Sequence, residues 1–239
     1  MSASLPHPAS PASGDDEGAL PPLCPKNTGR QSAGRPKASE AEARMHDLIQ
    51  TAGQLFLEKG YDKVSLEMIA REARVAVRTI YVKFGGKAGL LTAVINASRS
   101  HFFATMTDLE HDQRPLRDVL ADFGRHFIGL VMSTPALRLY RMVIADAQRN
   151  RELADAFFEA GPRQTREMLE RYFSRPDIRV QLRADVPTSV LPVHLMNCIL
   201  GDQLRRYLYE VPPEELEGAA LCRQLQLGLD LFLRGTLRE

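Results

Sequence analysis

The chain has 239 residues, of which 44% are hydrophobic and 26% charged, a balance typical of a globular protein with room for one or two domains. No apolar run approaches the roughly 18 residues that span a bilayer, and the first residues do not form a secretory signal, so we expect a cytoplasmic protein without a membrane partner. A formal net charge of only +1 excludes a chain that is basic throughout.

Positive charge is concentrated in one segment of the chain. Residues 30–90 hold 11 Lys and Arg against 7 Asp and Glu, whereas the segments before and after have a slight negative balance. Attraction to phosphate is local, because salt screens it over about 10 Å. The chain therefore fits a protein that binds a polyanion at one end.

Residues 1–38 are predicted to form a disordered arm, because they are rich in Pro, Ser, Gly and Ala and have no apolar periodicity. Arg35 and Lys37 lie at its end in a Gly-Arg-Pro-Lys sequence similar to half of an AT-hook. Extended cationic segments of this kind enter narrow minor grooves of DNA. Two interpretations stay open here: contact of these cations with a minor groove, or a solvated linker.

Three short helices are predicted within residues 39–86. Ser39 begins a Ser-x-x-Glu capping box, and apolar residues at spacings of three and four predict a helix that ends at Gly60. A second helix follows Ser65, and a third ends at Phe84. Only about three residues join the last two helices, which makes them cross steeply in a helix-turn-helix arrangement.

Polar residues of this segment indicate an interface with the DNA major groove. The third helix buries Ile80 and Phe84, which leaves Val77, Arg78 and Thr79 able to approach base edges. Arg78 is the strongest candidate for reading a base, because arginine binds guanine through two hydrogen bonds. The predicted DNA contacts are Ser65, Arg74, Val77, Arg78, Thr79, Tyr81, Lys83, Lys87, Arg35 and Lys37. A partly buried position for Tyr81 and an unengaged surface charge for Lys83 stay open as alternatives.

The remaining chain, residues 87–239, is predicted to form a second helical domain. Helical patterns cover residues 87–109, 115–132, 135–148, 151–160, 162–174, 187–209 and 213–234. Proline stands at the first turn of several of them, including Pro162 and Pro187. No strand alternation of useful length occurs. The predicted fold class is therefore all-α, with a three-helix helix-turn-helix domain at 39–86 followed by a larger helical bundle.

The region from Arg44 to Leu91 carries a dense pattern at fixed spacing. Its elements are Ala52, Phe56, Gly60, Ser65, Ile69, Ala70, Ala73, Val75, Ile80, Tyr81, Phe84, Lys87 and Leu90. This pattern resembles the N-terminal domain of TetR/AcrR-type transcriptional regulators. Two residues depart from it, since Arg74 replaces a turn glycine and Ala76 replaces a helix-capping serine. Each change costs on the order of 1 kcal/mol, so we expect a strained turn within the same fold.

The second domain is similar to the C-terminal domain of the AefR-related subgroup, chiefly from Leu137 to Ala145 and from Phe157 to Pro162. The resemblance implies a homodimer on a palindromic DNA operator and a small-molecule effector that releases it; repression is the common outcome, and activation is an alternative. Predicted effector contacts are Phe102, Phe103, Phe123, Phe127, Tyr140, Met142, Phe157 and Phe158, for which a plain core role stays open. His101, His126, Arg125, Arg138 and Arg141 are candidates for polar effector contacts or for surface ion pairs.

The last predicted helix is more apolar than a single outward-facing helix should be. The resemblance implies that it pairs with a second subunit, and the predicted dimer contacts are Leu221, Leu225, Leu229 and Phe232. Burial against another copy would remove this apolar surplus from water.

The sequence lacks the common motifs of enzyme active sites. The chain has no His-Glu-x-x-His, no Gly-x-Ser-x-Gly and no glycine-rich phosphate loop, so we expect neither catalysis nor a cofactor. Its histidines are scattered, and Cys24, Cys198 and Cys222 have no metal-binding spacing, so no metal site is predicted. A redox role for Cys198 or Cys222 stays open. An architectural DNA-coating protein is a further alternative, but it has no need of the long second domain.

Overall fold

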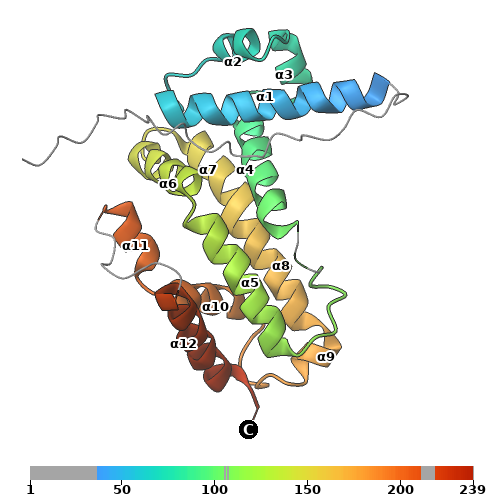
Figure 1. The fold of residues 1–239 in the computed structure, drawn as a ribbon, viewed down its shortest axis with the longest axis vertical. Helices are drawn as coiled ribbons and strands as arrows, with labels where there is room; N and C mark the ends of the chain where they lie inside the picture. The colour runs from blue at the N-terminus through green and yellow to red at the C-terminus, as the bar shows by residue number, and fades with distance from the viewer. Residues whose placement is uncertain (1–36, 105, 107, 211–218, 239) are drawn as a thin grey trace, which may run out of the picture.

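The computed structural model describes residues 37–104, 106, 108–210 and 219–238, which are almost entirely helical (Figure 1). The helices are α1 (Lys37–Lys59), α2 (Leu66–Glu72), α3 (Val77–Phe84), α4 (Lys87–Phe103), α5 (Leu116–Val131), α6 (Thr134–Asp146), α7 (Arg151–Phe158), α8 (Gln164–Ser174), α9 (Pro176–Arg179), α10 (Leu191–Leu200), α11 (Gln203–Leu208) and α12 (Ala219–Thr236), with a π-helix, η1 (Glu159–Arg163), between α7 and α8. Over these residues, β pairing is limited to one bridge between Leu182 and Leu237. The all-α class is confirmed.

The helices form a short crossing layer at one end of a longer bundle. Figure 1 shows α1 lying across the top, with α2 and α3 on its outer side and α4 descending from it. Helix α4 contacts α1 and α3 above and α5 and α7 below, while α10 and α12 pack together at the other end. Because α4 contacts both groups, it is a main physical link between them, and α1 also contacts α6.

One buried cluster joins the first three helices to α4 and α7. Phe56 of α1, Ile69 of α2 and Ile80 of α3 lie in it beside Leu91 of α4 and Leu153 of α7. Each large apolar side chain buried in this way stabilises the fold by about 1.5–3 kcal/mol. The three N-terminal helices therefore do not pack alone, since α4 and α7 complete their core. A second buried cluster lies between α5, α8, α10 and α12.

Helix boundaries differ from the predicted ones in several places. Helix α1 begins at Lys37, so Ser39 lies inside the helix and the predicted start was late. The pattern predicted through residue 109 ends at Phe103. The predicted helix 187–209 begins only at Leu191, and Gly201, with φ of 56°, separates α10 from α11. Residues 213–218 of the last predicted helix lie outside the described residues.

Pro162 does not start a new helix, contrary to the prediction. It lies inside η1, so α7, η1 and α8 run on without an intervening loop. Proline has no N–H to donate, and its ring collides with the carbonyl four residues earlier in a regular α-helix. A π-helical turn is wider and accommodates this ring without ending the helix.

No single helix in the described part of the chain is long and apolar enough to cross a membrane. Helices α5 and α6 reach that length and composition only as a pair, and a bend of 64° separates them.

A buried carboxylate holds the loop between α4 and α5. Asp112 accepts hydrogen bonds from the backbone N–H of Arg114 (3.0 Å) and from its side-chain Nε (3.0 Å) and Nη2 (2.6 Å). These hydrogen bonds hold the pKa of the Asp112 carboxyl below its usual value. Arg114 also donates to Asp122 of α5 (3.0 Å), and Arg175 donates to the Asp112 carbonyl (2.8 Å). The loop is thereby tied to α5 and to the end of α8.

We expect Asp112→Asn to lower the free energy of unfolding near neutral pH by about 1–3 kcal/mol, because the amide removes the buried one of the two carboxylates that pair with Arg114 and accepts fewer of its hydrogen bonds. Folding lowers the pKa of the Asp112 carboxyl from its usual value of 3.8. Its stabilising effect is therefore complete above the unfolded-state pKa and is lost as the pH falls through the lower pKa of the folded state. Urea unfolding of both proteins should show their difference shrinking below about pH 4. Asp185→Asn is the control, because Asp185 pairs with Arg183 (2.7 Å) at the surface; an equal loss there would contradict the importance of burial.

Candidate nucleic-acid interface and effector cavity

The joint between α2 and α3 has an unusual backbone. Helix α2 begins after Ser65, whose Oγ accepts a hydrogen bond from the N–H of Met68 (3.2 Å). Arg74 follows α2 in the left-handed region, with φ of 55°, as expected for a residue in the place of a turn glycine. Ala76 precedes α3 in an extended conformation and gives it no side-chain cap. The backbone strain predicted at this turn is therefore present at Arg74, whereas at Ala76 the departure from the pattern is the missing cap.

Helix α3 presents one side to solvent and one to the core. Ile80 is fully buried in the cluster that α3 shares with its neighbours, and α3 contacts α2 and α4. Arg78 and Lys83 are exposed, as are Tyr81 (57%) and Val82 (71%), so Tyr81 is not a core residue. Val77 and Thr79 are partly exposed. Val82 was not among the predicted contacts, although the helical period that buries Ile80 already places it on the outer face.

The cations of α2 and α3 differ from those of the bundle. Arg71, Arg74, Arg78 and Lys83 have no ion-pair partner among the described residues. Many arginines of the bundle instead pair with carboxylates, for example Arg163 with Glu159 and Glu167 (both 2.9 Å) and Arg175 with Asp177 (2.6 Å). The N-terminal end therefore carries positive charge that no internal carboxylate neutralises.

Lys87, at the start of α4, is partly buried. Its Nζ sits 4.2 Å from the centre of the Tyr61 ring, and burial lowers the pKa of its ammonium group. Burial also raises the pKa of Tyr61 to about 12. Lys87 thus connects the start of α4 to the loop before α2, an internal contact that the sequence did not predict.

The remaining predicted DNA contacts are Ser65, whose hydroxyl is already engaged within the chain, and the two cations Arg35 and Lys37. The Ser65 hydroxyl already caps α2, and the adjacent Glu67 places a carboxylate there, where it repels phosphate. Hydrogen bonds from its own backbone N–H and from Ser65 lower the pKa of Glu67. Arg35 lies outside the described residues. Lys37 begins α1, but its side chain is likewise outside what the structure describes.

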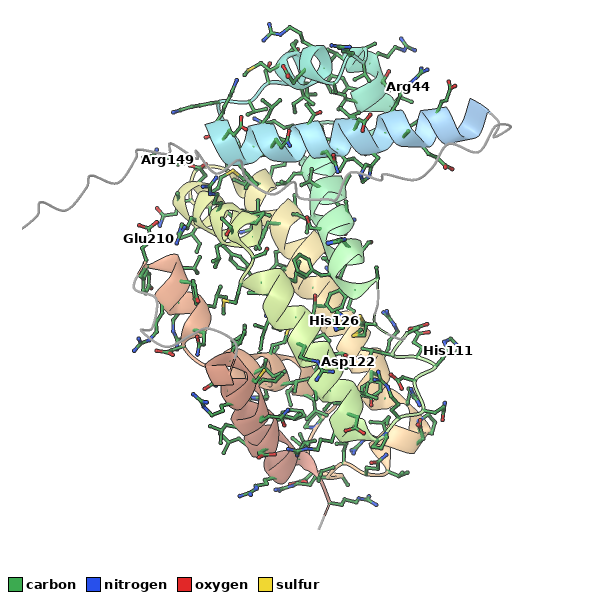
Figure 2. The ribbon with its side chains drawn as sticks, in the orientation of Figure 1. Arg44, His111, Asp122, His126, Arg149 and Glu210 are labelled. Atoms are coloured by element: carbon green, nitrogen blue, oxygen red, sulfur yellow. The ribbon has the colours of Figure 1, made fainter. Side chains whose placement is uncertain are left out.

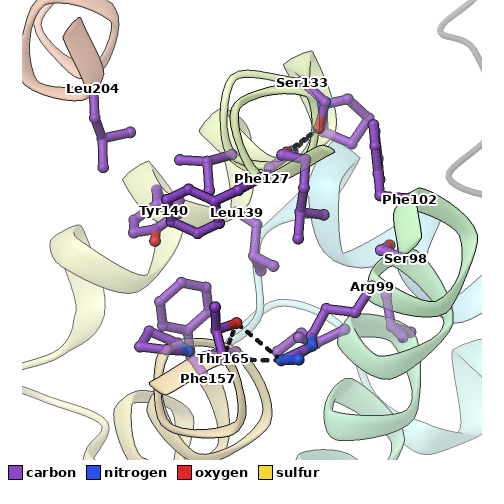
Figure 3. Close-up of a pocket in the computed structure, with 18 of the residues that line it drawn as sticks. Ser98, Arg99, Phe102, Phe127, Ser133, Leu139, Tyr140, Phe157, Thr165 and Leu204 are labelled. Carbon is purple, nitrogen blue, oxygen red and sulfur yellow. Dashed lines mark hydrogen bonds between the residues drawn. The ribbon is translucent and has the colours of Figure 1, made fainter. Parts of the chain in front are cut away.

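A cavity of about 570 Å³ lies among the bundle helices, with α1 closing part of its wall (Figure 3). Five of the predicted effector residues line it, namely Phe102, Phe127, Tyr140, Phe157 and Phe158. The rings of Tyr140 and Phe157 meet edge to face at 4.9 Å between centroids. Part of the wall comes from α1 through Gly53, Phe56 and Leu57, which the sequence did not suggest.

The three other predicted effector residues are core residues and do not line this cavity. Phe103 and Phe123 stack on each other with centroids 6.1 Å apart, beside the bundle core. Met142 packs against the cluster that contains the N-terminal helices. Their aromatic or sulfur-containing side chains marked them as candidates, but helical spacing alone does not separate a cavity wall from a packed core.

Arg99 is the main polar residue of the cavity, and sequence reasoning missed it. Its Nη1 donates hydrogen bonds to the carbonyl oxygens of Ala160 (3.3 Å) and Gly161 (3.1 Å) and to Oγ1 of Thr165 (3.2 Å). Burial lowers the pKa of its guanidinium. The available signal was its position, because it follows Ile95 by four residues on the apolar side of α4.

Among the predicted polar contacts, only His101 lines the cavity. His126 and Asp122 both lie on α5 (Figure 2), and His126 Nδ1 is 2.9 Å from the Asp122 carbonyl oxygen. Arg125 pairs with the Asp122 carboxylate (2.9 Å). Arg141 donates to the carbonyl oxygens of Tyr207 (2.5 Å) and Leu208 (3.2 Å). Arg138 is exposed.

The predicted dimer residues of α12 need correction. Leu225, Leu229 and Phe232 are buried within one chain, where α12 packs on α5 and α10, and Leu221 packs at the edge of the same core. The three buried side chains are not available to a second subunit, whereas Leu221 is only partly buried. The exposed apolar residues of α12 are instead Leu227 (60%) and Leu231 (70%).

No group of three His, Cys, Asp or Glu suited to hold a metal ion occurs within the residues that the structure describes. Cys198 is partly buried, which raises the pKa of its thiol, and Cys222 is exposed. Cys24 lies outside the described part.

Comparison with known proteins identifies the family. Residues 48–94 match the family model of bacterial regulatory proteins of the tetR family, and residues 118–234 match the C-terminal domain of AefR-like transcriptional repressors.

The chain is 28% identical over 182 residues to the HTH-type transcriptional regulator YdeS of Bacillus subtilis, covering 72% of this chain and 85% of that protein. A TetR-family regulator from Mesorhizobium loti has a similar structure, with a TM-score of 0.66 and 23% identity over 85% of this chain and all (100%) of that one. SmeT, solved in complex with triclosan, has a TM-score of 0.60 and 25% identity over 82% of this chain and 93% of the other. The chain belongs to the TetR family and is a DNA-binding transcriptional regulator, not an enzyme.

Proposed function

We propose that this regulator is a homodimeric repressor that binds a palindromic operator through α3 and is released when a small molecule occupies the cavity. The observation that carries the proposal is the exposed face of α3, with cations that no described carboxylate pairs. In this proposal the DNA reader is the predicted domain 39–86, with α1 extended back to Lys37, and residues 87–239 are the regulatory and dimerisation domain. Residues 1–36 of the predicted arm 1–38 lie outside the described residues. The proposal places the protein in the cytoplasm, where its DNA partner lies.

Arg78 and Val82 suit direct base contact. They lie four residues apart on α3 and are both exposed, so they share one face of the helix. In the major groove, arginine pairs with guanine, and an apolar side chain contacts the methyl group of thymine. Arg74, Tyr81 and Lys83 flank this pair and suit phosphate contact, which fixes register without reading sequence.

Two further residues have supporting places in the proposed interface. Lys87 is a positioning residue, because its cation contacts the Tyr61 ring and holds α4 against the loop before α2. Arg35 and Lys37 remain candidates for contact with a flanking minor groove.

A second copy of the chain would cover the exposed leucines of α12. Leu227 and Leu231 lie one helical turn apart and present an apolar strip to solvent. Pairing two such strips buries both, and twofold symmetry then presents two α3 helices to DNA. Two half-sites about one DNA turn apart, or roughly 34 Å, fit this arrangement.

Control by a ligand is supported by where the cavity lies. Phe56 and Leu57 of α1 and Ile95 and Arg99 of α4 line it, so a ligand there contacts helices that carry the DNA reader. SmeT, which has the same fold, was solved with triclosan bound. The AefR-like domain that the C-terminal half matches is described as that of a repressor. A ligand that binds best when α4 is in a position unsuited to DNA shifts the protein toward that conformation and lowers its affinity for the operator. By reciprocity, bound DNA lowers the affinity for the ligand by the same factor.

Replacing Arg78 with alanine should flatten the base preference at one or two positions of each half-site, because the lost contact discriminates bases by about 1–3 kcal/mol. Lys83→Ala is the control on the same helix. It should weaken binding to all sequences alike and reduce the salt dependence by about one unit per half-site. Selection from random oligonucleotides, followed by fluorescence anisotropy at several salt concentrations, measures both effects. The assignment fails if Arg78→Ala keeps wild-type affinity and specificity.

A further inference from the structure

The cavity holds positive charge without a carboxylate to balance it. Arg99, Arg166 and His101 belong to its lining, and none of the described lining residues is Asp or Glu. Arg166 is exposed and lies over the Phe158 ring, 5.3 Å from its centre. The rest of the lining is mostly aliphatic and aromatic, which suits an apolar ligand.

Arg99 is the more buried of the two arginines that line this cavity. Its hydrogen bonds within the described residues all use Nη1, and all go to uncharged oxygen atoms of Ala160, Gly161 and Thr165. Figure 3 shows its side chain reaching from α4 toward Thr165 and Phe157. Within the described chain, its Nε and Nη2 atoms have no hydrogen-bond partner. A partly buried cation with no counter-charge is unfavourable unless an anion joins it.

The two remaining nitrogen atoms form the edge of the guanidinium that binds a carboxylate through two parallel hydrogen bonds. Such bidentate pairs are among the strongest hydrogen bonds in proteins because both groups are charged and their geometry is fixed. While Nη1 stays on the η1 carbonyl oxygens, the edge of Nε and Nη2 keeps a fixed direction. Arg99 is therefore already oriented for an anion.

Tyr140 adds a second polar group to an otherwise apolar wall. Its hydroxyl has no hydrogen-bond partner among the described residues, and burial raises its pKa, so it stays a neutral donor and acceptor. Its ring packs on Phe157, beside the place that Arg99 reaches (Figure 3). A ligand with an aromatic or aliphatic body would contact these rings while its acid group met Arg99.

We propose that the cavity selects apolar monoanions, in particular carboxylates, and that Arg99 binds their acid group through Nε and Nη2. This inference rests on the effector role proposed above and names the ligand class for that role. Because Arg99 belongs to α4, which contacts α1 and α3, the new ion pair acts on the helix that positions the DNA reader.

Matched pairs of neutral and charged probes test the proposal on the full chain without DNA. Isothermal titration calorimetry compares 2-naphthoate with 2-naphthamide, and decanoate with decanamide. For at least one pair, the carboxylate should bind the wild type about tenfold or more tightly than its amide, as expected for a charge-assisted pair. Arg99→Gln should remove that preference, and Arg99→Lys should keep part of it, because lysine retains the charge but not the bidentate edge.

Arg138→Gln is the matched control, since Arg138 is exposed on α6 and does not line the cavity. It should bind all four probes as the wild type does. Thermal unfolding shows whether Arg99→Gln folds; if it does not, the wild-type comparison and Arg99→Lys decide. The proposal is overturned if neither carboxylate binds the wild type more tightly than its amide, or if a folded Arg99→Gln retains the preference. Operator binding is measured separately, so loss of DNA binding would overturn the proposed repressor role and leave the carboxylate result standing.

Discussion

Replacing Gly89 with alanine is expected to lower the affinity for operator DNA by about 30-fold or more. A Cβ atom at Gly89 would lie 1.7 Å from the carbonyl oxygen of Phe84, the last residue of α3, which is far inside van der Waals contact. The start of α4 and the end of α3 must then separate, so α3 changes its angle. Losing the base contacts of one half-site costs about 1–3 kcal/mol of binding free energy, and in a dimer the contacts of both half-sites are lost.

Gly235→Ala in α12 is the matched control for this variant, because its added methyl group meets nothing within 4 Å. It should leave DNA binding unchanged and raise stability by about 0.5–1 kcal/mol, the advantage of alanine over glycine in a helix. Anisotropy titration measures DNA affinity, and thermal unfolding checks that each variant folds. Wild-type affinity in a folded Gly89→Ala protein would contradict the role given to this close approach.

The double variant Leu227→Glu and Leu231→Glu is expected to give a folded monomer that binds the operator about 100-fold or more weakly. Both side chains are exposed in the single chain, so a charge there costs little stability. Between two copies, the same charges would lose water and repel one another. A monomer holds one recognition helix, so it loses the gain that comes from binding two linked half-sites.

Gln226→Glu is the matched control on α12. It adds one negative charge next to Leu227, on the side that faces Arg117 of α5, whose Nη2 lies 3.5 Å from the Gln226 Oε1. This variant should stay a dimer with wild-type DNA affinity. Light scattering at micromolar concentration gives the oligomeric state. A dimeric double variant would show that the strip of Leu227 and Leu231 is not the interface.

The turn before α3 was predictable from sequence because its determinants are local. A residue that follows a short helix and stands in the place of a glycine must accept positive φ, and Arg74 does so. The lack of a cap at Ala76 follows equally from its side chain, which has no oxygen. These features depend on neighbours within a few residues, so no knowledge of the bundle was needed.

The cavity was only partly predictable because distant segments build it. Its walls come from residues as far apart in sequence as Gly53 and Leu204. Helical periodicity shows which side of α4 is apolar but not that a void lies against it. An arginine such as Arg99 therefore looks like a surface residue until the carbonyl groups of η1 are placed beside it. Those carbonyl groups depend in turn on Pro162, which local rules assign to a helix start.

The dimer residues show a different limit of sequence reasoning. Helix α12 packs on both α5 and α10, so it needs a wide apolar face within one chain. Gly228 lets it approach α10 closely, since a Cβ there would lie 2.0 Å from the Cys198 carbonyl oxygen. An apolar surplus in the sequence does not show which leucines serve the chain itself and which remain for a partner.

The shared wall of the cavity also bears on how such regulators diversify. Phe56 belongs both to the core of the N-terminal helices and to the cavity lining. A mutation there that admits a new ligand also disturbs the fold of the DNA reader, so selection acts on both properties at once. Met196 and Leu204 line the cavity from α10 and α11, outside that core. New ligand preferences are therefore expected to arise first on the α10 and α11 side, while the α1 side changes slowly over evolution.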